Sequence, residues 1–382
     1  MSARRLMKQA DWGRFSVKTL GKNKKQSGSY NNMNDKKPFS FTGTGSEYFK
    51  IWIVNLMLTI VTFGIYSAWA KVRRLQYFYR NTWLNEANFD YHGDPTAILK
   101  GRVLAVILFS MYNVSSGLSL IWGLILLIPL MLVMPVLLYK SLRFRAINSS
   151  YSGLRFGFSA KLSETYKTFL LWPVLAFLTL FALAPSAHHR LRRFQHGHAR
   201  FGTSHFQFFA SIGSFYALYG KTLLLMLGLL TVLALAFGGG FATISELMNQ
   251  GADPDEAKAA MVGIFMLATF LVFVLGSLLI GPYFASRLQN LVWGHTELAG
   301  HRFGSNLGAR GLLWVRLTNL LGILLTFGLF KPFADVRLAR YRLEHMWLEP
   351  QGALDEFVRD AEQEAAAFGE EAAEIFDVDI GL

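Results

Sequence analysis

Apolar residues fall in long, nearly unbroken runs along this chain, and most charged residues lie between the runs or near the ends. Five runs reach the roughly 20 residues that a helix needs to cross the hydrocarbon core of a bilayer. They are Phe49–Ala70, Leu118–Tyr139, Thr222–Phe241, Met261–Phe284 and Leu313–Ala334. Two others are weaker, because Phe169–Ala187 is marginal and Ala97–Tyr112 is short. The pattern predicts a mainly α-helical, polytopic membrane protein.

The end of the first run recurs at the end of the last. Residues 62–73 read TFGIYSAWAKVR and residues 326–337 read TFGLFKPFADVR. Polar and glycine positions match as well as apolar ones, so hydrophobic composition alone does not explain the similarity. Three weaker copies lie between these two. The five copies align on one position each, which is Ala68, Pro135, Pro185, Pro282 and Pro332. Each copy carries a basic residue five positions later: Arg73, Lys140, Arg190, Arg287 and Arg337.

Each copy predicts the same series of elements. The aligned proline suits the first turn of a helix, and Gly64 or Gly328 just before it would end the preceding helix. Tyr151–Phe156 and Phe201–Phe206 indicate β-hairpins, because aromatic residues flank a turn that contains glycine. We therefore expect five modules of about 50 residues, each with a short β-hairpin, an apolar helix and a basic amphipathic helix. The modules begin near residues 39, 89, 156, 206 and 303 within a membrane domain of residues 39–348.

One part of this pattern resembles a known family. The run FTGTGSEYFKIWIVNLMLTIVTFGIYSAWAKVRRLQYFYRNTWL, followed by FDYHGDP, is similar to the YjgN-like family of bacterial multi-pass inner-membrane proteins. The likeness is strongest over Phe39–Arg102 and Leu313–Leu348. The resemblance implies the bacterial inner membrane as the location and a multi-pass fold. The family has no assigned activity, so the resemblance implies no catalytic residues.

Composition narrows the class further. Only 16% of the residues are charged, against about 25% in soluble proteins. The net charge is +13, although the tail at residues 349–382 is acidic. Basic residues beside apolar segments indicate a cytoplasmic face and contact with anionic membrane lipids, not nucleic-acid binding. The chain has no cysteine, which excludes disulfides, thiolate metal sites and thiol catalysis.

The topology of the basic segments has two interpretations. If modules one, three and five crossed the bilayer once, the basic helices would be divided between its two faces. If these modules instead enter and return, all the basic helices lie on the cytoplasmic side, as the positive-inside tendency favours. We prefer the second interpretation. The arm at residues 1–38 has no apolar signal region, and we expect it to be disordered and cytoplasmic, with the acidic tail also cytoplasmic.

The recurring basic position is the best-patterned candidate site. Its five residues, with Arg193 and Arg340 three positions beyond two of them, could form a site for an acidic solute or a lipid phosphate. The simpler interpretation is that these side chains extend toward water and anchor helix ends. Asn55 and Asn319 lie in apolar helices at matching positions. They could line a polar path, although such residues more often bond across a helix interface.

Other chemistry finds little support. Five histidines crowd residues 188–205, but four arginines and no carboxylate accompany them, which disfavours a metal ion. No paired carboxylates or nucleophile triad stands out, so we expect neither an enzyme nor a bound cofactor. Two functions remain open. One is a transporter or channel for a small anionic solute or lipid, and the other is a non-transporting membrane protein that binds anionic lipid or scaffolds partners.

Overall fold

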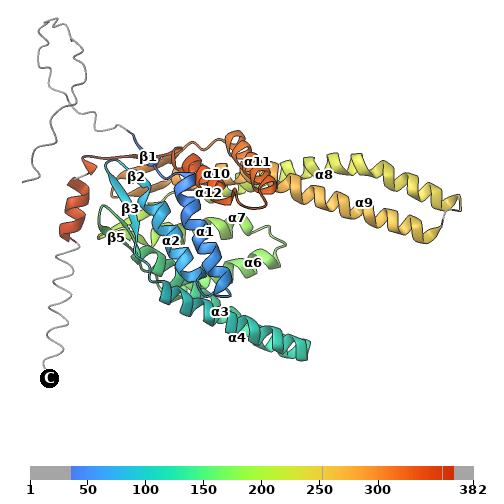
Figure 1. Ribbon diagram of the computed structural model, residues 1–382, viewed down its shortest axis with the longest axis horizontal. Helices are drawn as coiled ribbons and strands as arrows, with labels where there is room; N and C mark the ends of the chain where they lie inside the picture. The colour runs from blue at the N-terminus through green and yellow to red at the C-terminus, as the bar shows by residue number, and fades with distance from the viewer. Residues whose placement is uncertain (1–35, 252, 355, 365–382) are drawn as a thin grey trace, which may run out of the picture. The chain divides into compact units, whose positions relative to one another are not determined.

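The computed structural model describes residues 36–251, 253–354 and 356–364, so the predictions for most of the N-terminal arm and the end of the acidic tail lie outside the described residues. The described chain is mainly helical, and short strands separate groups of helices (Figure 1). The first half contains β1 (Lys37–Phe41), α1 (Gly45–Val61), α2 (Ser67–Arg80), β2 (Thr82–Leu84), β3 (Ala87–Tyr91), α3 (Pro95–Leu118), α4 (Leu120–Ile147), β4 (Ser149–Tyr151), β5 (Leu154–Phe158), α5 (Leu162–Tyr166), the π-helix η1 (Lys167–Leu171), α6 (Trp172–Leu178) and α7 (Ala184–Gly197).

The second half contains β6 (Ala199–Phe201), β7 (Ser204–Phe208), α8 (Ile212–Asn249), α9 (Pro254–Leu275), the π-helix η2 (Gly276–Ile280), α10 (Gly281–Trp293), β8 (Thr296–Leu298), β9 (His301–Ser305), α11 (Ala309–Leu325), α12 (Lys331–Leu343) and β10 (Met346–Glu349). Every segment between an odd-numbered strand and the next strand is helical.

The strands form one closed antiparallel barrel in the order β1-β10-β9-β8-β7-β6-β5-β4-β3-β2. Both predicted hairpins are confirmed, since Tyr151 pairs with Leu154 and Phe201 with Ser204. The prediction of separate hairpins was incomplete, because β1 also pairs with β10 and β2, which closes the ring. Closure satisfies the backbone groups that isolated hairpins would leave at their edges.

A ring of large side chains lines the barrel interior. Each odd-numbered strand contributes a phenylalanine, and that residue lies opposite a Leu, Tyr or Phe on an even-numbered strand. The paired residues are Phe39 with Leu84, Phe89 with Tyr151, Phe156 with Phe201, Phe206 with Leu298, and Phe303 with Leu348. Tyr151 donates a hydrogen bond from its hydroxyl to the Leu84 carbonyl at 2.9 Å, so this polar atom has a partner inside the barrel.

One side-chain bond recurs where a helix leads into the barrel. In each case a ring or amide nitrogen just before the strand lies 2.7 to 3.0 Å from the backbone carbonyl oxygen four residues earlier. The five residues are Asn81, Asn148, His198, His295 and His345. Asn and His can replace one another here because both carry a nitrogen donor at a similar distance from the backbone. The bond occupies a carbonyl at the end of the helix.

Four described helical stretches are long and apolar enough to cross a membrane: Pro95–Leu118, Leu120–Ile147, Ile212–Asn249 and Pro254–Trp293. They pack as two hairpins, α3 with α4 and α8 with the stretch that begins at α9 (Figure 1). The run at Ala97–Tyr112 looked too short, but α3 continues through Asn113, Ser115 and Ser116. Two of these polar side chains, Asn113 and Ser116, bond to carbonyls of the same helix, which lets the helix continue.

The runs Phe49–Ala70 and Leu313–Ala334 are not single spans. The helix α1 ends at Val61, and the chain reverses at Phe63 and Gly64, which have φ values of 48° and 89°. The same reversal follows α11, at Phe327 and Gly328. Phe63 and Phe327 are 98% and 99% exposed. Apolar side chains so fully exposed at these turns fit helical hairpins that enter the bilayer and return.

The closed barrel bears on the two topologies. All ten strands are hydrogen-bonded neighbours, so the helices that lead into them end at one common structure. This arrangement fits the interpretation in which the shorter helical pairs enter the bilayer and return, and it is difficult to combine with single crossings.

The chain after β10 covers part of the barrel. We call residues 350–364 the C-terminal segment, whose described residues 354 and 356–364 are helical. Leu354, Val358 and Ala361 are buried in the same apolar cluster as the barrel interior. Phe357 packs on Phe201 and on the ring of His301. The first part of the acidic tail is therefore folded against the barrel.

Candidate anion site beside the third helical hairpin

A cleft of about 640 Å³ lies between η1, α6, α7 and β7. Lys167 and Trp172 line it from one side, and Arg190 and Arg193 line it from α7. The two arginines are three residues apart on one helix and therefore project from the same face. The structure thus brings together two of the predicted anion-site residues and adds a lysine from a neighbouring element.

The cleft carries an excess of positive charge. The carboxylate that lines it, Glu164, already lies 2.7 Å from His198 Nε2. Within the described ranges, none of Lys167, Arg190 and Arg193 forms an ion pair with a carboxylate. Cations gathered without a counter-charge attract an anion, and guanidinium groups can bind phosphate oxygens in a bidentate manner.

An aromatic ring positions one of these cations. The Arg190 guanidinium carbon lies 4.1 Å from the centre of the Trp172 ring, within the range of a cation–π interaction. Tryptophan is enriched at the boundary between headgroups and hydrocarbon. The helix α6 then leads away from Trp172 to Phe177, Leu180 and Phe181, which are 66% to 90% exposed. The cleft therefore adjoins an exposed apolar surface.

The other residues of the recurring basic position lie on separate helices. Arg73, Lys140 and Arg287 are exposed on α2, α4 and α10. Arg73 lies over the ring of Tyr66 at 5.6 Å and Arg287 over that of Tyr283 at 5.7 Å. These contacts fit the interpretation that the side chains anchor helix ends at the membrane surface.

The two arginines of the fifth copy, both on α12, donate hydrogen bonds to acceptors within the protein. Arg337 donates to Asn319 Oδ1 at 2.8 Å and to Thr318 at 3.1 Å, and Arg340 donates to the Gly43 carbonyl at 2.8 Å. Asn319 also donates to the Ala334 carbonyl at 3.1 Å, across the interface of α11 and α12. Asn55 is buried at the matching position of α1, where its Oδ1 has no hydrogen-bond partner among the described residues.

The clustered histidines contact different partners. His188 Nδ1 lies 2.9 Å from the Tyr219 hydroxyl, His189 Nε2 lies 2.8 Å from the Ala210 carbonyl oxygen, and His198 bonds Glu164. Burial, with a smaller effect from Arg192, lowers the pKa of His196 to about 4. In the part of the chain that the structure describes, no three metal-ligating side chains converge.

Sequence reasoning missed Lys167 and Trp172, which line the cleft from outside the repeated helix. Both lie in the third module just before Pro173, where the helix changes to a π-helix over Lys167–Leu171. The one available signal was that a Lys and a Trp border an apolar run of marginal length. Single π-helical turns within α-helices are frequent at functional sites.

Comparison with known proteins places the chain in a family without assigning it an activity. A family model described as "Bacterial protein of unknown function (DUF898)" matches residues 36–375. The inner membrane protein YjgN of Salmonella typhimurium is 26% identical over 358 residues, covering 82% of this chain and 88% of that protein. YjgN of Escherichia coli O157:H7 is 32% identical over 36% of this chain and 35% of its own length. No solved structure matches the chain.

Proposed function

Because the chain belongs to the DUF898 family of bacterial proteins of unknown function, its role must be inferred from its own residues, and we propose that it is a lipid-binding inner-membrane protein and not an enzyme. The ligand is an anionic lipid whose phosphate enters the cleft of Lys167, Arg190 and Arg193. The observation that carries this proposal is a set of three cations without carboxylate partners, within the described chain, beside an exposed apolar helix tip.

The proposal includes the fivefold repeat. Its support is the recurring bond from Asn or His to a helix carbonyl and the phenylalanine contributed by each odd-numbered strand. In this arrangement the arginine pairs of the third and fifth modules are equivalent. In the fifth module, Arg337 and Arg340 already donate hydrogen bonds to acceptors within the protein. In the third module, Arg190 and Arg193 face an open cleft, which favours this pair as the ligand site.

The barrel is proposed to lie on the cytoplasmic side. Each helix that leads into the barrel carries one of the basic side chains, and positively charged segments are retained in the cytoplasm. Both ends of the described chain, β1 and the C-terminal segment, would then also be cytoplasmic. The three cations would meet the inner leaflet, where anionic headgroups concentrate.

The barrel interior favours a lipid over a small anionic solute as the ligand. The described residues that line it include no carboxylate, lysine or arginine, so an anion crossing the barrel would lose its hydration without compensation. Movement of a lipid between leaflets stays a prediction that binding alone does not test.

Binding can be measured by native mass spectrometry of the purified protein in detergent, titrated with phosphatidylglycerol or phosphatidylcholine. We expect a preference for phosphatidylglycerol that Arg190→Gln/Arg193→Gln reduces by about tenfold or more, since each basic group near an anionic lipid surface contributes about 1 kcal/mol. Competition with inorganic phosphate distinguishes a lipid headgroup from a free anion. Loss of lipid at low phosphate concentration would make the free anion the ligand.

The matched control is Arg73→Gln/Arg287→Gln, which removes two exposed arginines from the same repeat position outside the cleft. The control should retain the preference within about twofold. Equal losses in both double variants would show diffuse attraction to charge and would contradict the proposed site. A wild-type protein that does not discriminate between the two lipids would contradict the function.

A further inference from the structure

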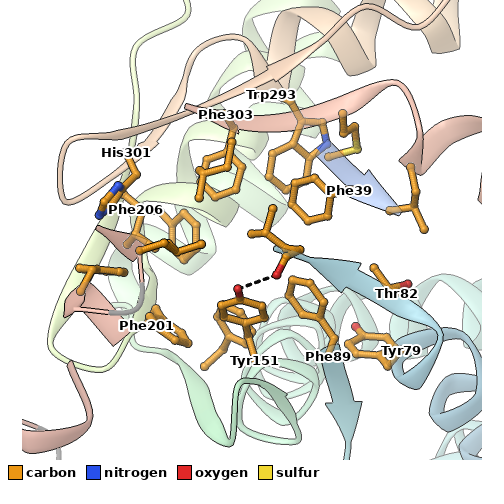
Figure 2. Close-up of a pocket in the computed structure, with 18 residues that line it drawn as sticks. Phe39, Tyr79, Thr82, Phe89, Tyr151, Phe201, Phe206, Trp293, His301 and Phe303 are labelled. Carbon is orange, nitrogen blue, oxygen red and sulfur yellow. Dashed lines mark hydrogen bonds between the residues drawn. The ribbon is translucent and has the colours of Figure 1, made fainter. Parts of the chain in front are cut away.

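The barrel contains an apolar chamber, partly open at its surface, that the anion site does not use. Its volume is about 370 Å³, and 18 residues line it (Figure 2). The ten large side chains of the strands surround its middle. Tyr79, Trp293 and Leu343 from the ends of α2, α10 and α12 line one part, and Leu354 and Phe357 of the C-terminal segment line another. The chamber therefore extends from the ends of the helices through the barrel to the segment that covers it.

The lining is suited to hydrocarbon and poorly suited to water. Phenylalanines from several strands face the space in Figure 2. Three of the polar atoms near it already have partners within the protein. The Tyr151 hydroxyl donates to the Leu84 carbonyl at 2.9 Å, and the Thr82 hydroxyl donates to the Phe78 carbonyl at 2.7 Å. His301 Nδ1 accepts the Gln351 backbone N–H at 3.0 Å. A buried water needs two to four polar partners, and most of this lining is aromatic or aliphatic.

The volume and extent of the chamber indicate the size and shape of its occupant. An apolar cavity of about 150 Å³ accepts benzene. A chamber of about 370 Å³ therefore holds an apolar group of roughly a dozen carbons. The passage from helix ends to C-terminal segment favours a linear chain over a compact ring system. The nearby bilayer provides such chains, since the helices that lead into the barrel end beside it.

We infer that the barrel chamber is a binding site for one saturated or weakly unsaturated hydrocarbon chain, held between the ring of barrel side chains and the C-terminal segment. The site is separate from the cleft at Arg190, because Gln207 of β7 lines the cleft and its sequence neighbour Phe206 lines the chamber. Successive side chains of a strand point to opposite faces. The two sites therefore lie on opposite sides of the barrel wall, and either can exist without the other.

The test uses a dodecyl alcohol that carries a diazirine on its terminal carbon, added to the full-length protein in phosphatidylcholine nanodiscs. After irradiation, adducts are located by peptide mass spectrometry. We expect adducts on strand residues such as Tyr151 and Phe303 and on residues 356–364, which lie outside all four membrane-length helices. Adducts confined to the membrane-length helices would overturn the proposal.

A filled chamber provides the second arm of the test. Leu84→Phe/Leu348→Phe adds two rings at a repeat position that Tyr151 and Phe201 already occupy, so the barrel can accommodate aromatic side chains there. We expect at least a fivefold loss of barrel adducts. If the double variant fails to fold, Phe206→Trp reduces the volume with a smaller change. Unchanged barrel labelling in a folded, filled variant would overturn the proposal.

The matched control adds the same rings outside the barrel. His205 and Arg302 are exposed neighbours of the chamber residues Phe206 and Phe303. His205→Phe/Arg302→Phe should leave barrel adducts within about twofold of wild type. All of these variants keep Arg190 and Arg193. A wild-type protein that prefers phosphatidylglycerol but shows no barrel adducts would contradict this inference without contradicting the proposed function.

Discussion

At the residue scale, one pair of positions shows how the same side chains can differ in their contacts. Asn319 and Arg337 of the last module are bonded at 2.8 Å. Asn55 and Arg73 stand at the matching positions of the first module, yet Arg73 lies over Tyr66 and the Asn55 Oδ1 atom has no partner among the described residues. Sequence identity at a repeat position therefore predicts the backbone more reliably than the side-chain bond.

Alanine at the two asparagines should have unequal effects. Asn319→Ala removes an acceptor of a guanidinium and a bond to the Ala334 carbonyl, and bonds to charged groups contribute about 1.5–3 kcal/mol. We expect Asn319→Ala to lower the free energy of unfolding by roughly that amount. Asn55→Ala removes a buried oxygen that lacks a partner, so it should cost less than about 1 kcal/mol. Thermal unfolding of the two variants in one detergent measures the difference, and equal destabilisation would contradict it.

Burial also predicts a pH effect at His301. Burial lowers the pKa of His301, and nearby Glu297 opposes this shift. The neutral ring accepts the Gln351 N–H, which holds the C-terminal segment against the barrel. Because the pKa of His301 is lowered when the segment is docked, docking has its full stability at pH values above the ordinary pKa of histidine. Docking then weakens as the pH falls below about 6.5, because the released state binds the proton first.

Hydrogen exchange of residues 356–364 at pH 7.5 and 5.5, corrected for the intrinsic exchange rate, measures this effect. Exchange should be faster at the lower pH in the wild type. His301→Gln, which cannot be protonated, should show the same protection at both pH values. Equal pH dependence in the two proteins would assign the effect to another group.

At the element scale, the short helical hairpins depend on glycine at their turns. Gly64 and Gly328 have φ values of 89° and 94°, and a Cβ atom at either position would meet nothing within 4 Å. Any destabilisation by alanine must therefore come from backbone strain. We expect Gly64→Ala and Gly328→Ala each to lower the free energy of unfolding by about 1–2 kcal/mol. Gly101→Ala is the control, since Gly101 lies within α3 with open space around it.

Thermal unfolding of the three variants separates backbone strain at the turns from the general effect of adding a methyl group. Gly101→Ala should leave stability unchanged or slightly higher, because alanine favours a helix interior over glycine. Similar melting temperatures for Gly64→Ala and Gly101→Ala would show that the reversal tolerates a side chain. The reversals would then owe their geometry to packing of the two helices.

The same elements mark the limit of prediction from sequence. The glycines and prolines predicted where helices break, and alternating aromatics predicted the hairpins, because these signals act over a few residues. Barrel closure depends on pairing between Lys37 and Leu348, which no local pattern encodes. The cleft likewise required η1 and α7 to pack together, so Lys167 could not be grouped with Arg190 from their positions in the chain.

At the scale of the whole molecule, the closed barrel requires all of its turns to lie on the same side of the membrane. Hydrogen-bonded strands cannot be divided between the two sides of a membrane, so the turns at Glu86, Ser152, Thr203 and Ala299 must share one side. The 24-residue helix α3 is about 36 Å long at 1.5 Å per residue, enough to cross a hydrocarbon core of about 30 Å. The turns after α3 and α8 should therefore lie on the other side.

Because the chain has no cysteine, single cysteines can report this directly. Cysteines placed at Glu86, Ser152, Thr203 or Ala299 should resist a membrane-impermeant maleimide in intact cells and react after permeabilisation. Cysteines at Ser119 and Gln250, at the far ends of the two long hairpins, should react without permeabilisation. A division among the four barrel turns would contradict the barrel itself. A uniform reversal would keep the barrel and move the cations at Arg190 to the outer leaflet, where a ligand would have to come from the periplasmic side.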